Sequence, residues 1–145
     1  MPPSDRRVAT ITLFAKFCDT DATGAVHHAQ YLTWMEEARM QLARDAGIDY
    51  RDFMDVGTFL ATTGVEIKYR RPVRYHDELS IVAWVEEMQS RGLRCGFEIN
   101  APDGKTCYAT AFSDHLLVTH EGRPTVVPKD WKDRLLQADG TAHSA

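Results

Sequence analysis

The residues of this chain that could do chemistry are concentrated in one short stretch, residues 18–31, which reads CDTDATGAVHHAQY. It places two acids, a glycine and two histidines directly before a run that is typical of a long helix. The start of a helix presents unpaired N–H groups and the positive end of the helix dipole, which can polarise a carbonyl group and hold a developing negative oxygen. A carboxylate nearby can attack that carbonyl or take a proton from water. Asp21 and the helix start near His28 could together supply both groups, and Gly24 between them lets the chain fold back tightly.

Structural roles compete with this interpretation. Asp19 and Thr20 fit a helix cap or a turn better than a catalytic role, and Asp21 taken alone would also fit one. The side chains of the adjacent His27 and His28 are expected to point in different directions. That geometry disfavours a metal site without another convergent ligand, and we expect no metal.

A strand and a long helix must position this stretch. Residues 8–17 alternate in hydrophobicity, which predicts a first strand. Residues 29–46 contain strong helix formers and no proline, and apolar residues recur at spacings of four, three and four from Tyr31 to Leu42. Gly47 follows where a C-terminal cap belongs. Such a helix would be roughly 27 Å long, which is long for a small domain.

Strand patterns dominate the rest of the chain. They predict four strands, at residues 62–72, 78–88, 92–99 and 106–119. A hairpin turn is predicted at residues 101–105, and a last short helix at residues 128–137. Short turns between successive strands favour antiparallel pairing, and the only large partner for the apolar face of the helix is the sheet. The sequence therefore predicts one α+β domain, residues 1–145, in which an antiparallel sheet curls around one long central helix. Residues 1–7 and 139–145 are expected to be loose tails.

Composition excludes several other classes of protein. The 145 residues are 43% hydrophobic and 26% charged, with a formal net charge of −4, which is ordinary for a globular domain and gives no electrostatic case for nucleic-acid binding. No segment has the apolar core of a signal peptide or the length of a membrane span, so we expect a cytoplasmic protein without membrane insertion. The three cysteines suggest neither a disulfide framework nor a zinc site. Cys18 lies beside an acid, which disfavours a reactive thiol, and we interpret it as a packing residue.

The stretch DTDATGAVHHAQYLTWMEEAR resembles the active-site segment of the 4-hydroxybenzoyl-CoA thioesterase family, and especially its bacterial branch of small acyl-CoA thioesterases associated with the Tol-Pal system. The family segment has the form D-x-D-x-x-G-x-V-x-H/Y-x-N-Y. The positions that match it in one register are Asp19, Asp21, Gly24, Val26, His28 and Tyr31. The resemblance continues through IKYRRPVRYHDELSIVAWV and weakens after about Val118. Gln30, where the family usually has Asn, and the small Ala25 depart from it and bear on the shape of the acyl pocket.

This resemblance implies the hotdog fold and acyl-CoA thioester hydrolysis without a metal or other cofactor. By position, it implies that Asp21 is the catalytic carboxylate and that the backbone N–H of His28 polarises the thioester carbonyl. It also implies a homodimer or homotetramer that binds acyl-CoA between two chains. The residues expected to contact the substrate are Gly24, Val26, Tyr31, Thr62 and Arg91, the last through the phosphates of coenzyme A. For Thr62 a structural role in its strand fits equally well.

Alternatives remain open at this stage. Another hotdog lineage places its catalytic acid on the central helix, where Glu36 and Glu37 lie, although helix glutamates are usually only solvated. A hotdog dehydratase or hydratase would use a histidine side chain as the partner of its acid. A non-catalytic acyl-CoA-binding hotdog would bind the same ligand without turnover. The sequence leaves open the acyl group, and whether Asp21 forms a covalent anhydride or activates water.

Overall fold

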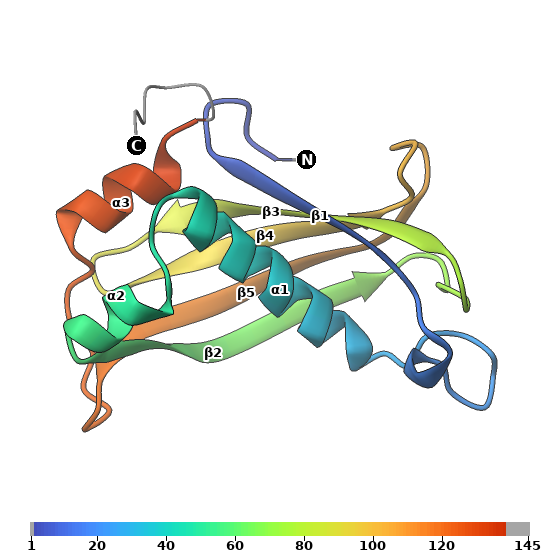
Figure 1. Ribbon diagram of the computed structural model, residues 1–145, viewed down its shortest axis with the longest axis horizontal. Helices are drawn as coiled ribbons and strands as arrows, with labels where there is room; N and C mark the ends of the chain where they lie inside the picture. Colours follow the sequence, from blue (N-terminus) through green and yellow to red (C-terminus); the bar gives the residue numbers. More distant parts are fainter. Residues whose placement is uncertain (1, 139–145) are drawn as a thin grey trace.

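The predicted long helix forms as α1, Gln30–Asp45, and one of its faces is buried in the centre of the molecule. The computed structural model describes residues 2–138 (Figure 1). The chain leaves α1 through Gly47, whose φ of +76° is the left-handed conformation that glycine adopts without strain at a helix end. The buried residues of the helix are Tyr31, Trp34, Met35, Ala38 and Leu42. Tyr31 and Trp34 are therefore aromatic residues of the core.

Five strands form a single antiparallel sheet in the order β1-β3-β4-β5-β2. Their bounds are β1 Val8–Phe14, β2 Thr58–Tyr69, β3 Glu78–Met88, β4 Gly92–Asn100 and β5 Cys107–Thr119. Successive strands β3, β4 and β5 are joined by short turns, including the predicted hairpin with Gly104 at a φ of +74°. The sheet curves across one side of α1, so the α+β architecture of a sheet around a central helix is confirmed (Figure 1).

The two edges of the sheet differ in how α1 covers them. The helix packs against β1 and β3, which lie at one side of the sheet. The other edge is β2, where Val65 and Tyr69 on the inner face are 45% and 47% exposed. The concave face beside β2 therefore stays partly accessible.

Two short helices close one end of the molecule. They are α2, Tyr50–Asp55, and α3, Lys129–Leu136. Phe53 of α2 and Trp131 of α3 meet edge to face with ring centroids 4.9 Å apart. Trp131 also belongs to a small second core with Leu117 of β5. The α2 helix was not predicted, because its six residues are too few to show a helical period within residues 47–61.

Several boundaries differ from those predicted. The first strand ends at Phe14 instead of continuing to residue 17, because Phe17–Asp19 form a 3-10 turn, η1. The strand predicted from residue 62 already begins at Thr58. The segment before β1 is not loose at its end, since the Arg6 guanidinium donates to the carbonyl oxygen of Val85 at 2.7 Å. The predicted tail at residues 139–145 lies outside the described residues. Within residues 2–138, no helix has the length and apolar character to cross a membrane.

Candidate active site

The stretch before α1 folds as a small hairpin. Thr20 and Val26 form an antiparallel bridge, and the Asp21 N–H donates to the carbonyl oxygen of Ala25 at 2.9 Å. The turn is closed by the Gly24 N–H, which donates to the Asp21 carbonyl oxygen at 3.0 Å. Gly24 has a φ of +82°, a conformation that residues with a Cβ rarely adopt. Gly24 therefore shapes the loop, and its contact with the substrate stays a prediction.

Asp21 lies at the exposed tip of this hairpin, and a single carboxylate oxygen is anchored. Its Oδ1 accepts hydrogen bonds from the Thr23 backbone N–H at 2.8 Å and from the Thr23 hydroxyl at 2.5 Å. These bonds, assisted by the nearby imidazoles of His27 and His28, lower the pKa of Asp21 below its usual value. Among residues 2–138, Oδ2 accepts no hydrogen bond. The loop thus presents an ionised carboxylate with one oxygen fixed and the other available.

The chain just before α1 presents an available backbone donor. The His28 N–H donates to no acceptor within the described part of the chain. The carbonyl oxygen of His28 accepts a hydrogen bond from the Tyr69 hydroxyl at 2.8 Å, which ties the loop to the end of β2. Tyr31 packs edge to face on the same Tyr69 ring, with centroids 4.9 Å apart. A side chain from β2 thereby anchors His28, the residue whose N–H is a candidate oxyanion donor.

The two histidines do not diverge as predicted. Their rings lie side by side, with centroids 4.3 Å apart and planes inclined by 33°. His27 Nδ1 accepts a hydrogen bond from the Ala29 N–H at 3.2 Å, so this imidazole helps to order the approach to the helix. In the described residues, no three or more His, Cys, Asp or Glu side chains converge as metal ligands.

Asp19 has the structural role that was predicted for it. Its side chain is buried, and its Oδ2 accepts a hydrogen bond from the Lys16 N–H at 2.9 Å, which caps η1. The Thr20 hydroxyl donates to the Phe17 carbonyl oxygen at 2.7 Å. The exposed Cys18 thiol points at Asp19 Oδ1, at 3.8 Å. The 3-10 turn therefore fixes the start of the hairpin, and Asp21 is the carboxylate of the stretch that remains accessible.

A cavity of about 270 Å³ adjoins the helix start. Its lining residues are Ala25, Val26, His28, Tyr31, Tyr69, Arg70, Arg71 and Pro72. Two of the predicted contact residues, Val26 and Tyr31, are among them. The guanidinium of Arg70 donates to the Thr110 hydroxyl at 3.2 Å. Two arginines are thus placed beside the helix start, close to the available N–H of His28.

A second cavity, of about 230 Å³, lies further along α1. Its lining includes Thr62, the third predicted contact residue, together with Ser113 and His115 of β5. His115 is only 3% exposed. Burial, assisted by the positive charge of Arg39 and opposed by Asp114, lowers the pKa of His115 to about 4, so its imidazole is neutral at neutral pH. The sequence analysis missed Ser113 and His115, although two polar residues on the same face of an apolar strand were a detectable signal.

Arg91 is not brought to Asp21 within one chain. It lies in the turn between β3 and β4, where its carbonyl oxygen accepts a hydrogen bond from the Leu117 N–H at 2.9 Å. The Asp21 hairpin instead contacts the residues before β3, at the opposite end of that strand (Figure 1). The eleven residues of β3 span roughly 35 Å. A role for Arg91 beside Asp21 would therefore require a second chain.

The two helix glutamates occupy different places. Glu36 is at the rim of the second cavity with a side chain that is 69% exposed, and Glu37 lines a separate groove beside β1. Neither of them lines the cavity at the helix start.

The sheet that curves around one long helix is the hotdog fold. A 1,4-dihydroxy-2-naphthoyl-CoA thioesterase from Synechocystis has this fold with a TM-score of 0.80 and 20% identity, over 88% of this chain and 95% of that one. A hypothetical protein from Aquifex aeolicus gives a TM-score of 0.80 with 26% identity, over 87% of this chain and 98% of that one.

Sequence comparison extends this likeness from fold to family. Residues 16–135 match the thioesterase-like superfamily. A Bacillus subtilis (strain 168) protein named "Putative acyl-CoA thioesterase YneP" is 31% identical over 106 residues, which are 73% of this chain and 76% of that protein. The chain belongs to the thioesterase-like superfamily.

Proposed function

We propose that this protein is an acyl-CoA thioesterase in which Asp21 is the nucleophile or general base and the His28 N–H is an oxyanion donor. Membership of the thioesterase-like superfamily and the name of the Bacillus subtilis relative support thioester hydrolysis. One observation carries the assignment of residues: among residues 2–138, Asp21 Oδ2 and the His28 N–H make no hydrogen bond, and they lie in the same short loop.

The chemistry follows from what these two groups can do. The N–H at the start of α1, reinforced by the helix dipole, polarises the thioester carbonyl and stabilises the negative charge that develops on its oxygen. In one route, Asp21 Oδ2 attacks the carbonyl carbon, the carbon–sulfur bond breaks, and the coenzyme A thiolate leaves. Water then hydrolyses the resulting mixed anhydride. In the other route, the carboxylate takes a proton from a water molecule that attacks the same carbon, the carbon–sulfur bond breaks, and the coenzyme A thiolate leaves.

Positioning residues make either route more efficient. Thr23 anchors one oxygen of the carboxylate and leaves the other directed outward. Tyr69 fixes the peptide of His28 through its carbonyl oxygen. Because proximity and orientation account for a large part of catalysis, a loop held at both groups is better suited to the reaction than a mobile one.

We propose that the coenzyme A moiety lies over the cavity at the helix start. Arg70 and Arg71 line this cavity, and the planar guanidinium group suits phosphate oxygens. Arg91 would contribute to the same site only from a neighbouring chain. In that arrangement, Arg91→Ala raises KM more than it lowers kcat.

We propose that the active form is a homodimer or a homotetramer in which β2 pairs with a second copy. The supporting features are the exposed apolar residues of β2 and the partly accessible concave face beside it. This face is accessible because α1 packs mainly against β1 and β3, toward the other edge of the sheet. An apolar edge strand left in water invites pairing with another chain. Light scattering at assay concentration tests this, and a fully active protein with the mass of one chain would contradict it.

Two finer assignments are also proposals. The active-site motif supports the 4-hydroxybenzoyl-CoA thioesterase branch and its Tol-Pal-associated members as the nearest group within the superfamily. The composition supports a cytoplasmic location.

The central test is turnover of a panel of acyl-CoA thioesters by wild type and Asp21→Asn, with release of the free thiol as the readout. Asparagine keeps the shape of the side chain and removes its charge, so kcat should fall by roughly 1,000-fold or more. Glu37→Gln is the matched control, because it removes a helix carboxylate away from the helix-start cavity. Near-normal turnover by a folded Asp21→Asn protein would contradict the assignment and direct attention to Glu36 and Glu37.

A further inference from the structure

The second cavity contains a partly buried polar cluster that the proposed hydrolysis at Asp21 does not use. The cluster consists of Thr62 of β2 with Ser113 and His115 of β5. Thr62 Oγ1 lies 3.2 Å from His115 Nδ1, and Ser113 Oγ lies 2.7 Å from His115 Nε2. Ser113 and His115 are 4% and 3% exposed. Thr62 is exposed, on the edge strand. Burying polar side chains such as Ser113 and His115 costs free energy unless they are paired, and here both are paired within the cluster.

The hydrogen atoms of this cluster leave a donor for a ligand. A neutral imidazole has one N–H and one lone pair, so one of the two hydroxyls must donate to the ring and the other must accept from it. The hydroxyl that accepts keeps its own O–H free. This holds for either tautomer of His115. The cluster therefore presents one hydroxyl donor to the cavity, from Thr62 or from Ser113.

Arg39 of α1 supplies further donors to the same cavity. Its side chain is 16% exposed and lines the cavity together with the cluster. Within residues 2–138, the guanidinium makes no hydrogen bond, and its one ion-pair contact is a Glu36 carboxylate oxygen at 4.0 Å. The Glu36 side chain is 69% exposed, so it can turn into water. A mostly buried guanidinium with so weak a partner is suited to bind a carboxylate, whose two oxygens match its planar fork.

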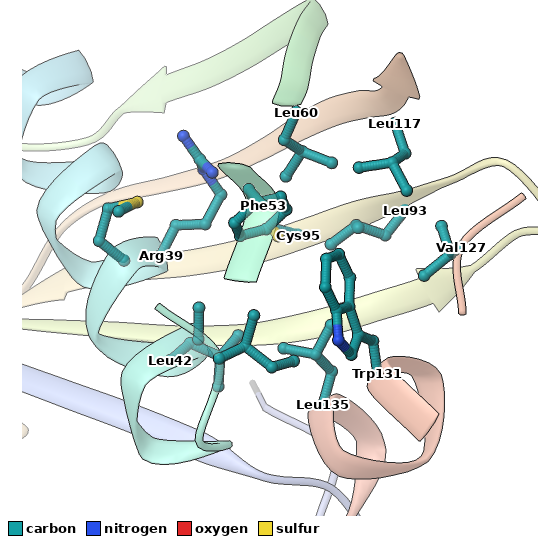
Figure 2. Close-up of a pocket in the computed structure, with 13 residues that line it drawn as sticks. Arg39, Leu42, Phe53, Leu60, Leu93, Cys95, Leu117, Val127, Trp131 and Leu135 are labelled. Carbon is teal, nitrogen blue, oxygen red and sulfur yellow. The ribbon is translucent and has the colours of Figure 1, made fainter. Parts of the chain in front are cut away.

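Arg39 also separates this cavity from a smaller apolar one. The smaller cavity is about 40 Å³, and both cavities have Arg39 in their lining. Figure 2 shows Leu42, Leu93 and Trp131 around the apolar cavity, with the guanidinium of Arg39 on the side away from Trp131. An acyl group in the 230 Å³ cavity that extended further along α1 would meet the charge of Arg39 before it reached this apolar space.

We infer that the acyl group of the substrate ends in a carboxylate, which Arg39 and the Thr62–His115–Ser113 cluster bind in the second cavity. The inference rests on the proposed thioesterase function, and it names the class of substrate as coenzyme A thioesters of short ω-carboxy acids. The side chains that line the second cavity are hydrogen-bond donors or uncharged, apart from the carboxylate of Glu36 at its rim. Such a site favours an anionic acceptor over an apolar end, because an apolar end would leave the guanidinium and a hydroxyl without partners.

The test uses matched pairs of ligands and variants of the full chain. Glutaryl-CoA and adipoyl-CoA are compared with isosteres in which an isopropyl group replaces the terminal carboxylate, after subtraction of uncatalysed hydrolysis. The variants are Arg39→Met, which keeps length and removes the charge, and Arg39→Lys, which keeps the charge and removes the fork. Arg94→Met is the control, because Arg94 pairs with Asp114 and does not line the cavity.

Wild type should prefer the carboxylate over its isostere by roughly 100-fold in kcat/KM. Arg39→Met should abolish or invert this ratio, Arg39→Lys should give an intermediate value, and Arg94→Met should keep the wild-type ratio. Equal turnover of both members of each pair, with a ratio unchanged in Arg39→Met, would overturn the inference and leave the thioesterase proposal standing.

Binding is measured in parallel so that the two proposals can fail separately. Thioether analogues of coenzyme A lack the reactive carbonyl. Two of them, one ending in a carboxylate and one in an isopropyl group, are titrated by calorimetry into wild type and Arg39→Met. Selective binding of the carboxylate analogue that is lost in Arg39→Met supports the inference even if no thioester is turned over. Equal binding of both analogues by wild type would overturn it. Ser113→Ala gives a second test, because loss of the cluster should also weaken selectivity in a protein that retains Arg39.

Discussion

The Asp21 hairpin and the Thr62–His115–Ser113 cluster are two polar sites beside α1 that control charge by opposite means. Asp21 is exposed, and hydrogen bonds from Thr23 two residues away lower its pKa and keep it ionised. His115 is buried, and desolvation lowers its pKa to about 4 and keeps it neutral. Both pKa values are lowered. A lowered pKa keeps the acid Asp21 negatively charged, whereas it keeps the base His115 uncharged. An accessible ion suits attack on a substrate, and a neutral buried group suits recognition.

The largest effect expected from this comparison is on stability at acid pH. In the unfolded chain His115 binds a proton near pH 6.5, whereas in the folded protein it does so only near pH 4. Between these values the unfolded state binds more protons, so stability falls as the pH falls from about 6.5 to about 4. The contribution of His115 over this window is about 3 kcal/mol. Urea unfolding of wild type and His115→Gln across the window measures it.

The comparison between the two proteins isolates this histidine. Other groups titrate equally in both, and Arg39, Glu36 and Asp114 are the charged groups around His115 that both proteins keep. His115→Gln should lose less stability than wild type between neutral and acid pH. If the free energy of unfolding falls equally with pH in the two proteins, burial does not hold the imidazole neutral.

A smaller effect is expected from the local hydrogen bonds of the hairpin. Thr23→Val removes the hydroxyl that anchors Asp21 Oδ1 and keeps the size of the side chain. The pKa of Asp21 should rise toward its ordinary value, which moves the acid limb of kcat/KM to higher pH. At neutral pH, kcat should fall roughly 10-fold, because the carboxylate is no longer held in place. A pH–rate profile measures both changes.

Thr23→Ser is the control for this prediction. It restores the hydroxyl without the methyl group, so it should recover most of the rate and the position of the acid limb. A serine variant that behaves like the valine variant would mean that Thr23 acts through packing.

The smallest effect is expected from His28→Ala. The proposed role of His28 lies in its backbone N–H, which alanine retains, so kcat should change by only about 3-fold or less. Turnover of the folded variant beside Asp21→Asn provides the measurement. Equal damage from the two substitutions would make the imidazole a participant, as in a hotdog dehydratase or hydratase.

The hairpin could be predicted from the sequence because everything that shapes it is local. Gly24 for the turn, the acid before it and the helix after it all lie within one short stretch, and turn and cap chemistry depends on near neighbours. The helix and the five strands were predictable for the same reason, since hydrophobic periodicity reports which face each element buries.

The cluster could not be predicted in this way. Thr62 and His115 are 53 positions apart, and their contact depends on the pairing of β2 with β5. The sequence shows Ser113 and His115 as two polar residues on one face of their strand, but nothing in it links them to Thr62. The role of Arg39 was missed as well, because an arginine on an amphipathic helix is usually solvated, and only the tertiary structure encloses this one.

The irregularity in β2 determines which side chains can share the concave face. The pairing of β2 with β5 skips from Thr62 to Gly64, which leaves Thr63 as an extra residue in the strand. In a regular strand, Thr62 and Tyr69 would point to opposite faces, because they are an odd number of positions apart. The extra residue corrects this parity, so the cluster and the tyrosine that holds the His28 peptide lie on the same side. Deletion of Thr63 would leave each half of the strand chemically intact and yet turn one half over, so that Thr62 and Tyr69 would no longer lie on the same face of the sheet.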